Sequence, residues 1–290
     1  MSLLTPKATL KPATKPATKL VSVSSGRGLL IALLSNPSMG KSSLLAQFPN
    51  VHFICDSRDT KILDLMDYSE QTGVALRRDQ VEVVTSFIDL CDAVITASKD
   101  PEVSTIVIES LVGVQALATD HCMNTDYGYL TDPVKAKNGF INYRNGHEMT
   151  AMVYFQKLLD CMLAAQTKGK NVFITGHTKL GTAKSITVGT EDFIADIIEC
   201  SPEIARRLKA TIPNILHIGA TNITQKAYGQ PKAKATGEST STLYCTQNPH
   251  FPAQNCLGVY SDIEFPRDPK LAYQAVCDLF KLDLTTGKRR

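Results

Sequence analysis

The sequence predicts an α/β protein with a mainly parallel central sheet flanked by helices. From residue 28 onward, apolar runs of strand length alternate with longer segments of helical periodicity. The runs are continuously apolar rather than alternating, which is typical of strands that are buried on both faces. The expected strands cover residues 28–35, 51–56, 104–110, 171–177 and 214–220.

Two helices are expected between these strands. Residues 79–98 and 148–169 carry apolar side chains three and four positions apart, as a helix with one covered face requires, and Gly169 is placed to end the second helix. Residues 119–147 and 178–192 are polar and loop-like instead. Loops of this length inside a compact domain are usually functional or disordered, so both segments are candidate binding loops.

The last part of the chain predicts a loop excursion, a strand and a closing helix. The residues that follow Thr221 are rich in Gly, Lys, Pro and Ser, and residues 242–247 predict a strand. Residues 268–280 predict an amphipathic helix, with Asp268 as its N-cap and Pro269 in its first turn.

The N-terminal segment, residues 1–26, predicts a flexible basic tail. Its near-repeat K-P-A-T contains prolines that block helix, and little apolar surface is available to offset the entropy cost of ordering. No acidic residue occurs before Asp56, so every charged residue up to Lys41 is basic. Two interpretations remain, a solvated leader without a partner or a loose electrostatic tether to nucleic acid or an acidic protein. The rest of the chain divides into a core over 27–265 and a C-terminal helix and tail over 266–290.

Composition places the chain among soluble globular proteins of the cytoplasm. It has 290 residues, of which 43% are hydrophobic and 20% charged, and its net charge of +3 is too small to indicate nucleic-acid binding by itself. Its 8 cysteines include no C-x-x-C pair, which favours reduced thiols over a disulfide framework or a zinc site. No apolar run reaches the roughly 18 residues of a membrane span, and the first residues lack the apolar core of a secretion signal, so no membrane association is expected.

A phosphate-binding loop is predicted directly after the first strand. Such loops read Gly, four free positions, Gly, Lys, then Ser or Thr; Gly40, Lys41 and Ser42 match, while Ser35 replaces the first glycine. A buried strand precedes the segment and a helix-compatible run, residues 41–48, follows it, so backbone amides are expected to point at a phosphate. The alternative is a turn of small residues that binds no ligand. The expected cofactor-binding residues are Ser35, Asn36, Pro37, Ser38, Met39, Gly40, Lys41, Ser42 and Ser43.

Polar residues at the ends of other strands are candidates for the chemistry around a bound phosphate. Magnesium takes oxygen ligands, which the Ser42 hydroxyl and the Glu109 carboxylate would supply. Asp56 or Asp59 would polarise the attacking water, and His177 would sense the terminal phosphate. Each residue also has a plainer interpretation, as an exposed strand-end acid, a helix-capping aspartate or a structural histidine.

In their order along the chain, four motifs resemble those of the RecA-like P-loop ATPases. They are SNPSMGKSS, the acid-tipped FICDSRD, IVIESLVG and VFITGHTK, and the resemblance spans residues 28–265. Among these ATPases the chain is most similar to the compact phage proteins of the single-strand-annealing, recombination-mediator type. In that family IDS commonly follows the magnesium strand and T-x-H ends the next strand, and here IES and TGH stand at those places.

The resemblance implies an ATP- and magnesium-dependent protein that binds single-stranded DNA and promotes recombination or strand annealing in the cytoplasm of a bacterium or a phage-infected cell. It also implies a homo-oligomer, ring or filament, with the nucleotide at a subunit interface, and a single-strand-binding protein is a further candidate partner. The two loop segments would face the DNA with cations beside aromatic side chains, and ordinary solvated loop charge is the alternative. The DNA-binding candidates are Lys135, Lys137, Tyr143, Arg144, Lys179 and Lys184.

Besides Ser35, two departures from the family pattern bear on hydrolysis. Arg58 stands two residues beyond Asp56, where the family has a catalytic acid. Late in the chain, relatives tend to carry a basic A-K-x-R stretch, whereas this chain has the uncharged Gln254 and Cys256. Arg206 and Arg207 are two basic residues that would compensate for the missing cations.

These departures keep a second function open, a P-loop nucleotide-binding scaffold or assembly protein with little hydrolysis. A small-molecule kinase is a third possibility, and the shortage of arginine in the loop segments argues against it, because such enzymes usually carry an Arg-rich lid.

Overall fold

A computed structural model describes residues 26–59, 61–67, 76–128, 139–141, 144–183, 192–225 and 234–289. Within these ranges the chain forms a nine-stranded sheet with the order β3-β2-β4-β5-β1-β7-β8-β9, and β6 pairs with β5 off this path. The strands are β1 (Leu30–Ser35), β2 (Val51–Asp56), β3 (Val81–Val84), β4 (Thr105–Glu109), β5 (Asn171–Ala183), β6 (Phe193–Ile198), β7 (Asn214–Gln225), β8 (Lys234–Tyr244) and β9 (Ile263–Glu264).

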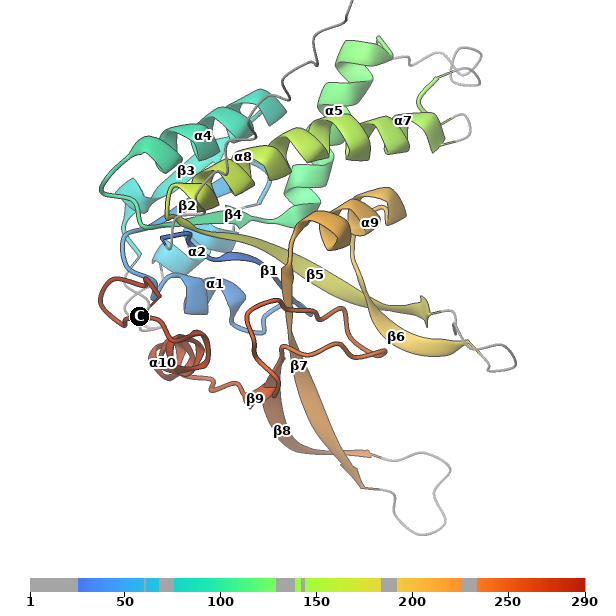
Figure 1. Ribbon diagram of the computed structural model, residues 1–290. Coiled ribbons are helices and arrows are strands. Elements are labelled where there is room, and N and C mark those ends of the chain that lie inside the picture. The colour runs from blue at the N-terminus through green and yellow to red at the C-terminus, as the bar shows by residue number, and fades with distance from the viewer. Residues whose placement is uncertain are drawn as a thin grey trace, which may run out of the picture.

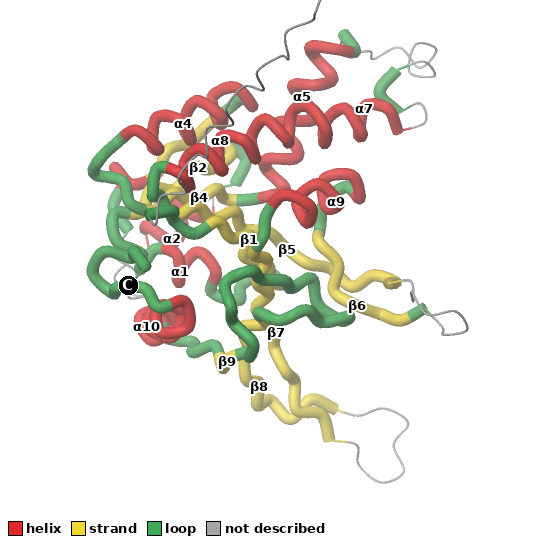
Figure 2. The backbone as a smooth tube through the Cα atoms, in the orientation of Figure 1, coloured by secondary structure: helices red, strands yellow, loops and turns green. Residues whose placement is uncertain are grey.

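Helices cover both faces of this sheet (Figures 1 and 2). One face carries α4, α5, α7 and α8, and the other carries α1 and α10. The helical elements are α1 (Lys41–Leu45), α2 (Lys61–Asp67), η1 (Arg78–Gln80), α4 (Phe87–Lys99), α5 (Leu111–Asp126), α7 (Asn145–Met149), the π-helix η3 (Thr150–Phe155), α8 (Gln156–Thr167), α9 (Pro202–Thr211) and α10 (Pro269–Phe280). The predicted α/β class is therefore confirmed.

The continuous apolar runs become strands because both faces of the sheet are buried. All pairings from β3 through β2, β4, β5 and β1 to β7 are parallel, as predicted. In β1, Leu30, Ala32 and Leu34 belong to the apolar cluster under α4, α5 and α8. Ile31 and Leu33 belong to the cluster under α1 and α10. Successive side chains of a strand point to opposite faces, so neither face of β1 tolerates a polar residue.

The helix expected over residues 79–98 is wrong in its first part. Val81–Val84 form β3, which pairs in parallel with β2 at the edge of the sheet. The helix α4 begins only after Ser86, whose hydroxyl accepts a hydrogen bond from the Asp89 amide at 3.1 Å. Three valines in four residues suit an edge strand better than a helix, and pairing with β2 outweighs the helical spacing.

The loop expected over residues 119–147 is also wrong in part, because α5 continues to Asp126. Cys122 is fully buried on this last section of α5, so tertiary packing supports a helix that its polar composition does not predict. The second expected helix begins earlier than residue 148, at Asn145, and ends at Thr167. Gly169 follows it with a φ of +84°, which confirms its role in ending the helix.

Two strand pairs extend beyond the helical layers as hairpins (Figure 1). β5 continues past residue 177 to Ala183 and pairs with β6. β7 continues past residue 220 to Gln225 and pairs with β8, where a loop excursion was expected. These outer sections lack the continuous apolar run of a strand that is buried on both faces, so a search for such runs does not find them. The closing helix α10 is confirmed, and Asp268 caps it by accepting hydrogen bonds from the amides of residues 270 and 271 at 2.8 and 3.0 Å.

Some predictions fall outside the residues that the structure describes. They are the tail over residues 1–25 and the DNA-binding candidates Lys135, Lys137, Tyr143 and Lys184. In the described part of the chain, no helix has the length and apolarity that crossing a membrane requires.

Candidate functional site

The predicted site residues come together at the carboxyl ends of four parallel strands. Ser35 at the end of β1 lies in register with His177 on β5, and Glu109 at the end of β4 lies in register with Cys55 on β2. Asp56 follows as the last residue of β2. In an open parallel sheet the carboxyl ends of the strands form the usual ligand-binding edge, so this is the candidate site.

The segment over residues 35–43, here named the 35–43 loop, turns sharply between β1 and α1. Ser38 and Gly40 both adopt positive φ angles, 63° and 83°. Gly40 occupies the position directly before α1, where a left-handed conformation costs a glycine little and a larger residue more. These two turns bring the chain back over its own Lys41 side chain.

Lys41 is buried at the centre of the loop, with 5% of its surface exposed. Its Nζ donates a hydrogen bond to Ser35 Oγ at 2.7 Å, and lies 3.3 Å from His177 Nδ1 and 3.5 Å from the Asn36 carbonyl oxygen. Ser35 in turn donates to that carbonyl at 2.6 Å. The serine that replaces the first glycine of the motif therefore holds the lysine amine in place, a role that its position in the sequence does not reveal.

Ser42 and Glu109 lie side by side, as the magnesium prediction requires. The Ser42 hydroxyl donates to Glu109 Oε2 at 3.1 Å, and Glu109 is only 6% exposed. Burial raises the pKa of Glu109 above its usual value, and the Lys41 amine and the hydrogen bond from Ser42 offset part of this rise. A hydroxyl and a carboxylate are hard oxygen ligands that fit Mg²⁺, which typically takes one or two carboxylates together with substrate phosphates and water. Among the described residues, no group of three or more His, Cys, Asp or Glu side chains could hold a metal ion.

The three catalytic candidates line one cavity of about 690 Å³. Asp56, Asp59 and His177 reach it from β2, the turn after β2, and β5, and Arg58 and Lys179 lie on its wall. These segments are far apart in the sequence, and the parallel pairing of the strands brings them together. The roles of the three candidates remain predictions, but their shared cavity gives them access to the same reacting group.

Arg58 binds the buried carboxylate of Asp56 within that cavity. Its Nε donates to Asp56 Oδ2 at 2.9 Å and its Nη2 lies 2.8 Å from the same oxygen, while Nη1 donates to Asp120 at 3.1 Å. A bidentate guanidinium–carboxylate contact is among the stronger ion pairs. Arg58 is thus a cation that neutralises the neighbouring candidate base, Asp56.

A second cavity of about 500 Å³ borders the 35–43 loop. Ser38, Gly40 and Ser43 form one wall, and the segment after β9 with Phe265 and Arg267 forms another. Sequence reasoning placed the residues from 266 onward outside the core and therefore missed this site. The wall is assembled from segments far apart in the chain, and no motif connects them.

A buried polar chain connects the loop to the β5–β6 hairpin through His217, which the sequence reasoning also missed. Thr178 Oγ1 donates to Asn36 Oδ1 at 3.3 Å and lies 3.3 Å from His217 Nε2, which is 3.6 Å from an Asp196 carboxylate oxygen. Burial, with a smaller effect of the Lys41 charge, lowers the pKa of His217 to about 4, so the ring is neutral at physiological pH. The sequence does contain one indication of such a role: His217 is a polar residue inside an apolar strand run.

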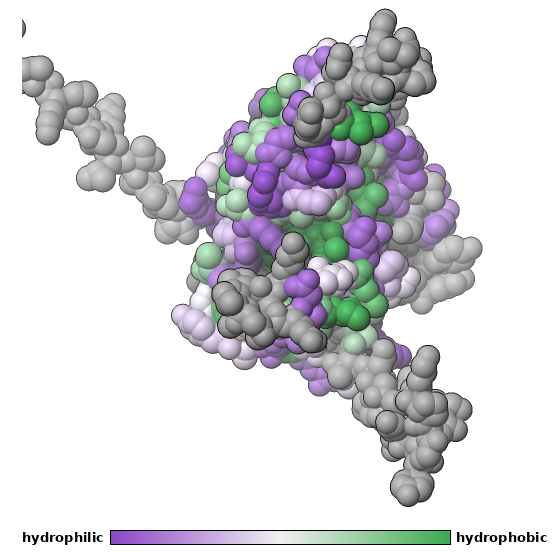
Figure 3. Space-filling model, turned by 90° about the vertical axis from the view of Figure 1, so that its right-hand side faces the viewer, coloured by the Kyte–Doolittle hydropathy of each residue, from purple (hydrophilic) through white to green (hydrophobic). Residues whose placement is uncertain are grey.

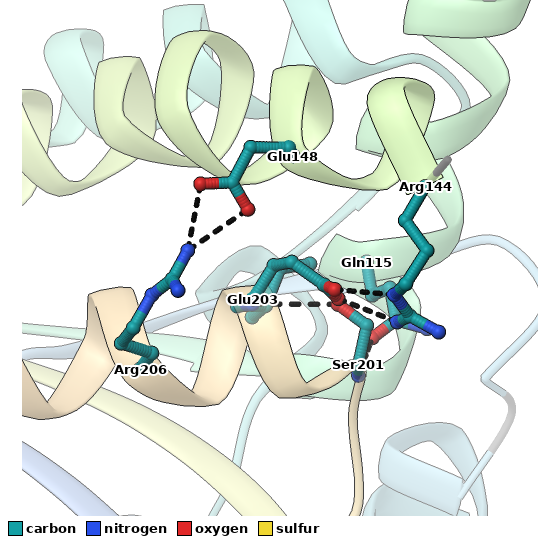
Figure 4. A network of polar contacts seen from close by, with 7 residues as sticks. Gln115, Arg144, Glu148, Ser201, Glu203 and Arg206 are labelled. Carbon is teal, nitrogen blue, oxygen red and sulfur yellow. Dashed lines mark hydrogen bonds and ion pairs between the residues drawn. The ribbon is translucent and has the colours of Figure 1, made fainter. Parts of the chain in front are cut away.

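Two of the basic candidates are held in ion pairs between α7 and α9, as Figure 4 shows. Arg144 donates to both carboxylate oxygens of Glu203 at 2.6 and 2.7 Å, and Arg206 donates to both oxygens of Glu148 at 2.7 and 2.8 Å. The Ser201 amide also donates to Gln115 Oε1 at 2.6 Å. These contacts hold α9 against the helical layer, and they place the guanidinium of Arg144 in an ion pair with Glu203.

Replacing Arg144 with methionine is expected to destabilise the fold only while Glu203 is ionised. The Arg144 guanidinium lowers the pKa of Glu203 from 4.5 to about 2. Because the pKa is lower in the folded than in the unfolded chain, this contribution is complete above about pH 4.5 and is lost as the pH falls toward 2. Urea midpoints of the wild type and the variant should differ at neutral pH and converge in acid. The control is Arg77→Met, which removes an exposed pair with Asp79 and should change the midpoint little.

The β5–β6 hairpin carries exposed apolar side chains next to a basic one. Leu180 is 76% and Ile194 69% exposed, and the pairing register places both on the same face. Lys179 is exposed on the opposite face, across from Ile197. Figure 3, which looks onto the side of the molecule that carries the hairpin, shows hydrophobic residues gathered between hydrophilic areas. Exposed apolar surface of this kind commonly marks an interaction site.

No protein-family model matches the sequence, and no curated protein matches it. The function of the chain is therefore inferred from the site itself and from the motifs that it contains.

Proposed function

We propose that the chain is a RecA-like P-loop ATPase that binds ATP with Mg²⁺ at the 35–43 loop and acts on single-stranded DNA in recombination or annealing. One observation carries the nucleotide part of this proposal. Glu109 and His177 are far in sequence from the adjacent residues Lys41 and Ser42, yet the pairs Lys41–His177 and Ser42–Glu109 meet within hydrogen-bond distance. A cation, a hydroxyl and a carboxylate in this arrangement suit a triphosphate and its metal ion.

Each part of the ligand has residues that would hold it. The Lys41 amine would exchange its bond to Ser35 for phosphate oxygens, because a charged acceptor makes the stronger hydrogen bond. Ser42 and Glu109 would ligate Mg²⁺, which supplies charge neutralisation at the phosphates when bound. The nucleoside would occupy the cavity next to Gly40, where Phe265 contributes an apolar wall.

The contact between Lys41 and His177 supports coupling between nucleotide and DNA. A phosphate that draws the Lys41 amine away also changes the contact of that amine with His177 Nδ1, which is 3.3 Å long. The next residue along β5 is Thr178, which bonds to the loop through Asn36, and Lys179 follows it on the surface. A change at the phosphate therefore has a short covalent route to the hairpin that would contact DNA. The proposed active form is a homo-oligomer, as the family resemblance implies.

A nucleotide-binding scaffold with little hydrolysis is the second candidate, and the contact between Arg58 and Asp56 favours it. A carboxylate that is held by a guanidinium at 2.8 Å is a poor base for activating water. Gln254, which stands where relatives tend to carry a cation, donates to the carbonyls of residues 209 and 212 at 3.0 Å and so has a structural role. Asp59 is then the remaining candidate base.

Phosphate release separates the two candidates. We expect the purified chain with ATP and Mg²⁺ to release phosphate faster when a single-stranded oligonucleotide is added, and size-exclusion chromatography to show a larger species with an ATP analogue and the oligonucleotide. Lys41→Met measured in parallel corrects for contaminating ATPases. Tight ATP binding without turnover, with or without DNA, would support the scaffold. Absence of any ATP binding would refute both.

A further inference from the structure

The packed helices α4 and α8 each contribute one cysteine to the same apolar cluster. Cys91 lies on α4 within the apolar cluster under these helices and is 1% exposed. Cys161 lies on α8, is half-buried, and packs against the same cluster. The two helices lie side by side on one face of the sheet (Figure 1).

The register of the two helices places these cysteines at the same level. Both helices lead into neighbouring parallel strands, β4 and β5, so they run in the same direction. Near their ends, Lys168 Nζ donates to Ser98 Oγ at 3.0 Å. Cys161 precedes Lys168 by seven residues, as Cys91 precedes Ser98, and seven residues correspond to about two helical turns. Because Lys168 contacts Ser98 at the helix ends, the two parallel helices should also bring Cys161 close to Cys91, two turns earlier.

The thiols are chemically unequal. The mutual interaction of the two thiols lowers the pKa of Cys161 and raises the pKa of Cys91, and the Lys157 amine, one turn before Cys161 on α8, lowers both. Burial further raises the pKa of Cys91. Cys161 is thus the thiol that ionises first, and it is also the one that solvent reaches. An accessible low-pKa thiol beside a buried partner is the usual arrangement of an attacking and a resolving cysteine.

We propose that Cys161 and Cys91 form a redox modification site that a peroxide converts to an internal disulfide. The Cys161 thiolate attacks one peroxide oxygen, the O–O bond breaks, and a sulfenic acid forms at Cys161 while hydroxide leaves and takes up a proton as water. The Cys91 sulfur then attacks the Cys161 sulfur, and the sulfenic oxygen leaves as a second water with the Cys91 proton. Two thiols are oxidised by two electrons, and one hydrogen peroxide is reduced to two waters.

The disulfide would fix α4 to α8 on the face of the sheet opposite α1. It closes a long loop of chain, from residue 91 to residue 161, and a cross-link of this kind restricts the unfolded state. The proposal uses no residue of the 35–43 loop, so its test is independent of the proposed ATPase function.

The test is oxidation of the full chain by hydrogen peroxide, followed by alkylation of remaining thiols in denaturant and peptide mass mapping without reductant. We expect a cross-linked peptide pair containing Cys91 and Cys161, and a rise in the thermal midpoint that dithiothreitol reverses. Cys161→Ser should lose both effects. Cys256→Ser, which removes an exposed cysteine elsewhere in the chain, should keep both.

Two results would overturn the proposal. One is full alkylation of Cys91 and Cys161 after peroxide treatment under conditions that oxidise Cys256. The other is a cross-link that joins either cysteine to a different partner with equal yield. Cys91→Ala is a second variant, because it should halt oxidation of Cys161 at the sulfenic acid, which dimedone traps, whereas a disordered helix pair would show no such selectivity.

Discussion

Replacing Lys41 with methionine is expected to weaken ATP binding by about a hundredfold or more, since two charge-assisted hydrogen bonds to phosphate oxygens contribute about 3 kcal/mol or more. Methionine keeps the length of the buried stem, so the apolar contacts of the side chain persist while the amine is lost. The folded chain loses the contacts of Nζ with Ser35 and His177, at 2.7 and 3.3 Å, and should remain folded. Titration calorimetry with ATP and Mg²⁺ measures the affinity, and circular dichroism checks the fold.

The matched control for this variant is Lys99→Met. Lys99 is exposed in the last turn of α4, so its loss removes the same charge without touching the 35–43 loop. We expect wild-type affinity for ATP in the control. Equal affinities for all three proteins would show that the triphosphate binds elsewhere, and would refute the proposed site.

Replacing Glu109 with glutamine is expected to abolish the dependence of ATP affinity on Mg²⁺ and to lower phosphate release roughly a hundredfold. Glutamine retains the size of the side chain and an oxygen that accepts the Ser42 hydrogen bond, but it carries no charge for a divalent cation. Burial raises the pKa of Glu109, which shows that the protein environment disfavours the charged form. The variant should therefore fold at least as stably as the wild type.

Glu102→Gln is the control, because Glu102 is an exposed acid in the turn before β4 and lies outside the site. The measurement is a magnesium titration of ATP affinity, with EDTA as the metal-free reference. A Glu109→Gln protein that keeps the wild-type magnesium dependence would assign the metal to other ligands. A variant that unfolds would contradict the expected gain from removing a buried charge.

The buried strands and the residues that end them were predictable from the sequence. β1, β2 and β4 coincide closely with the expected runs, because a strand that is buried on both faces must be apolar at every position. Their polar end residues, Ser35, Asp56 and Glu109, stand out against those runs for the same reason. The pattern fails where burial no longer constrains the residues. The polar outer sections of β5 and β7 were therefore expected to be loops, and the edge strand β3 was expected to be helix.

The partners of charged residues could not be predicted in the same way. Arg144 is predicted to contact DNA, and its ion pair with Glu203 on α9 was not foreseen. Arg58 was expected only to replace an acid, whereas it neutralises Asp56. A side chain with a long flexible stem can reach many neighbours, and its sequence position does not say which oppositely charged group lies within reach.

The sequence by itself determined which segments are buried strands and which residues end them, because both depend on local composition and spacing, and on the same basis it predicts a triphosphate site at the 35–43 loop. Only the tertiary structure decided which strand ends are neighbours. Lys41 meets His177, and Ser42 meets Glu109, because β5 pairs between β1 and β4. The order of strand pairing follows from the packing of both helical layers onto the whole sheet. This packing depends on contacts between segments that are distant in sequence, and no local sequence pattern encodes them.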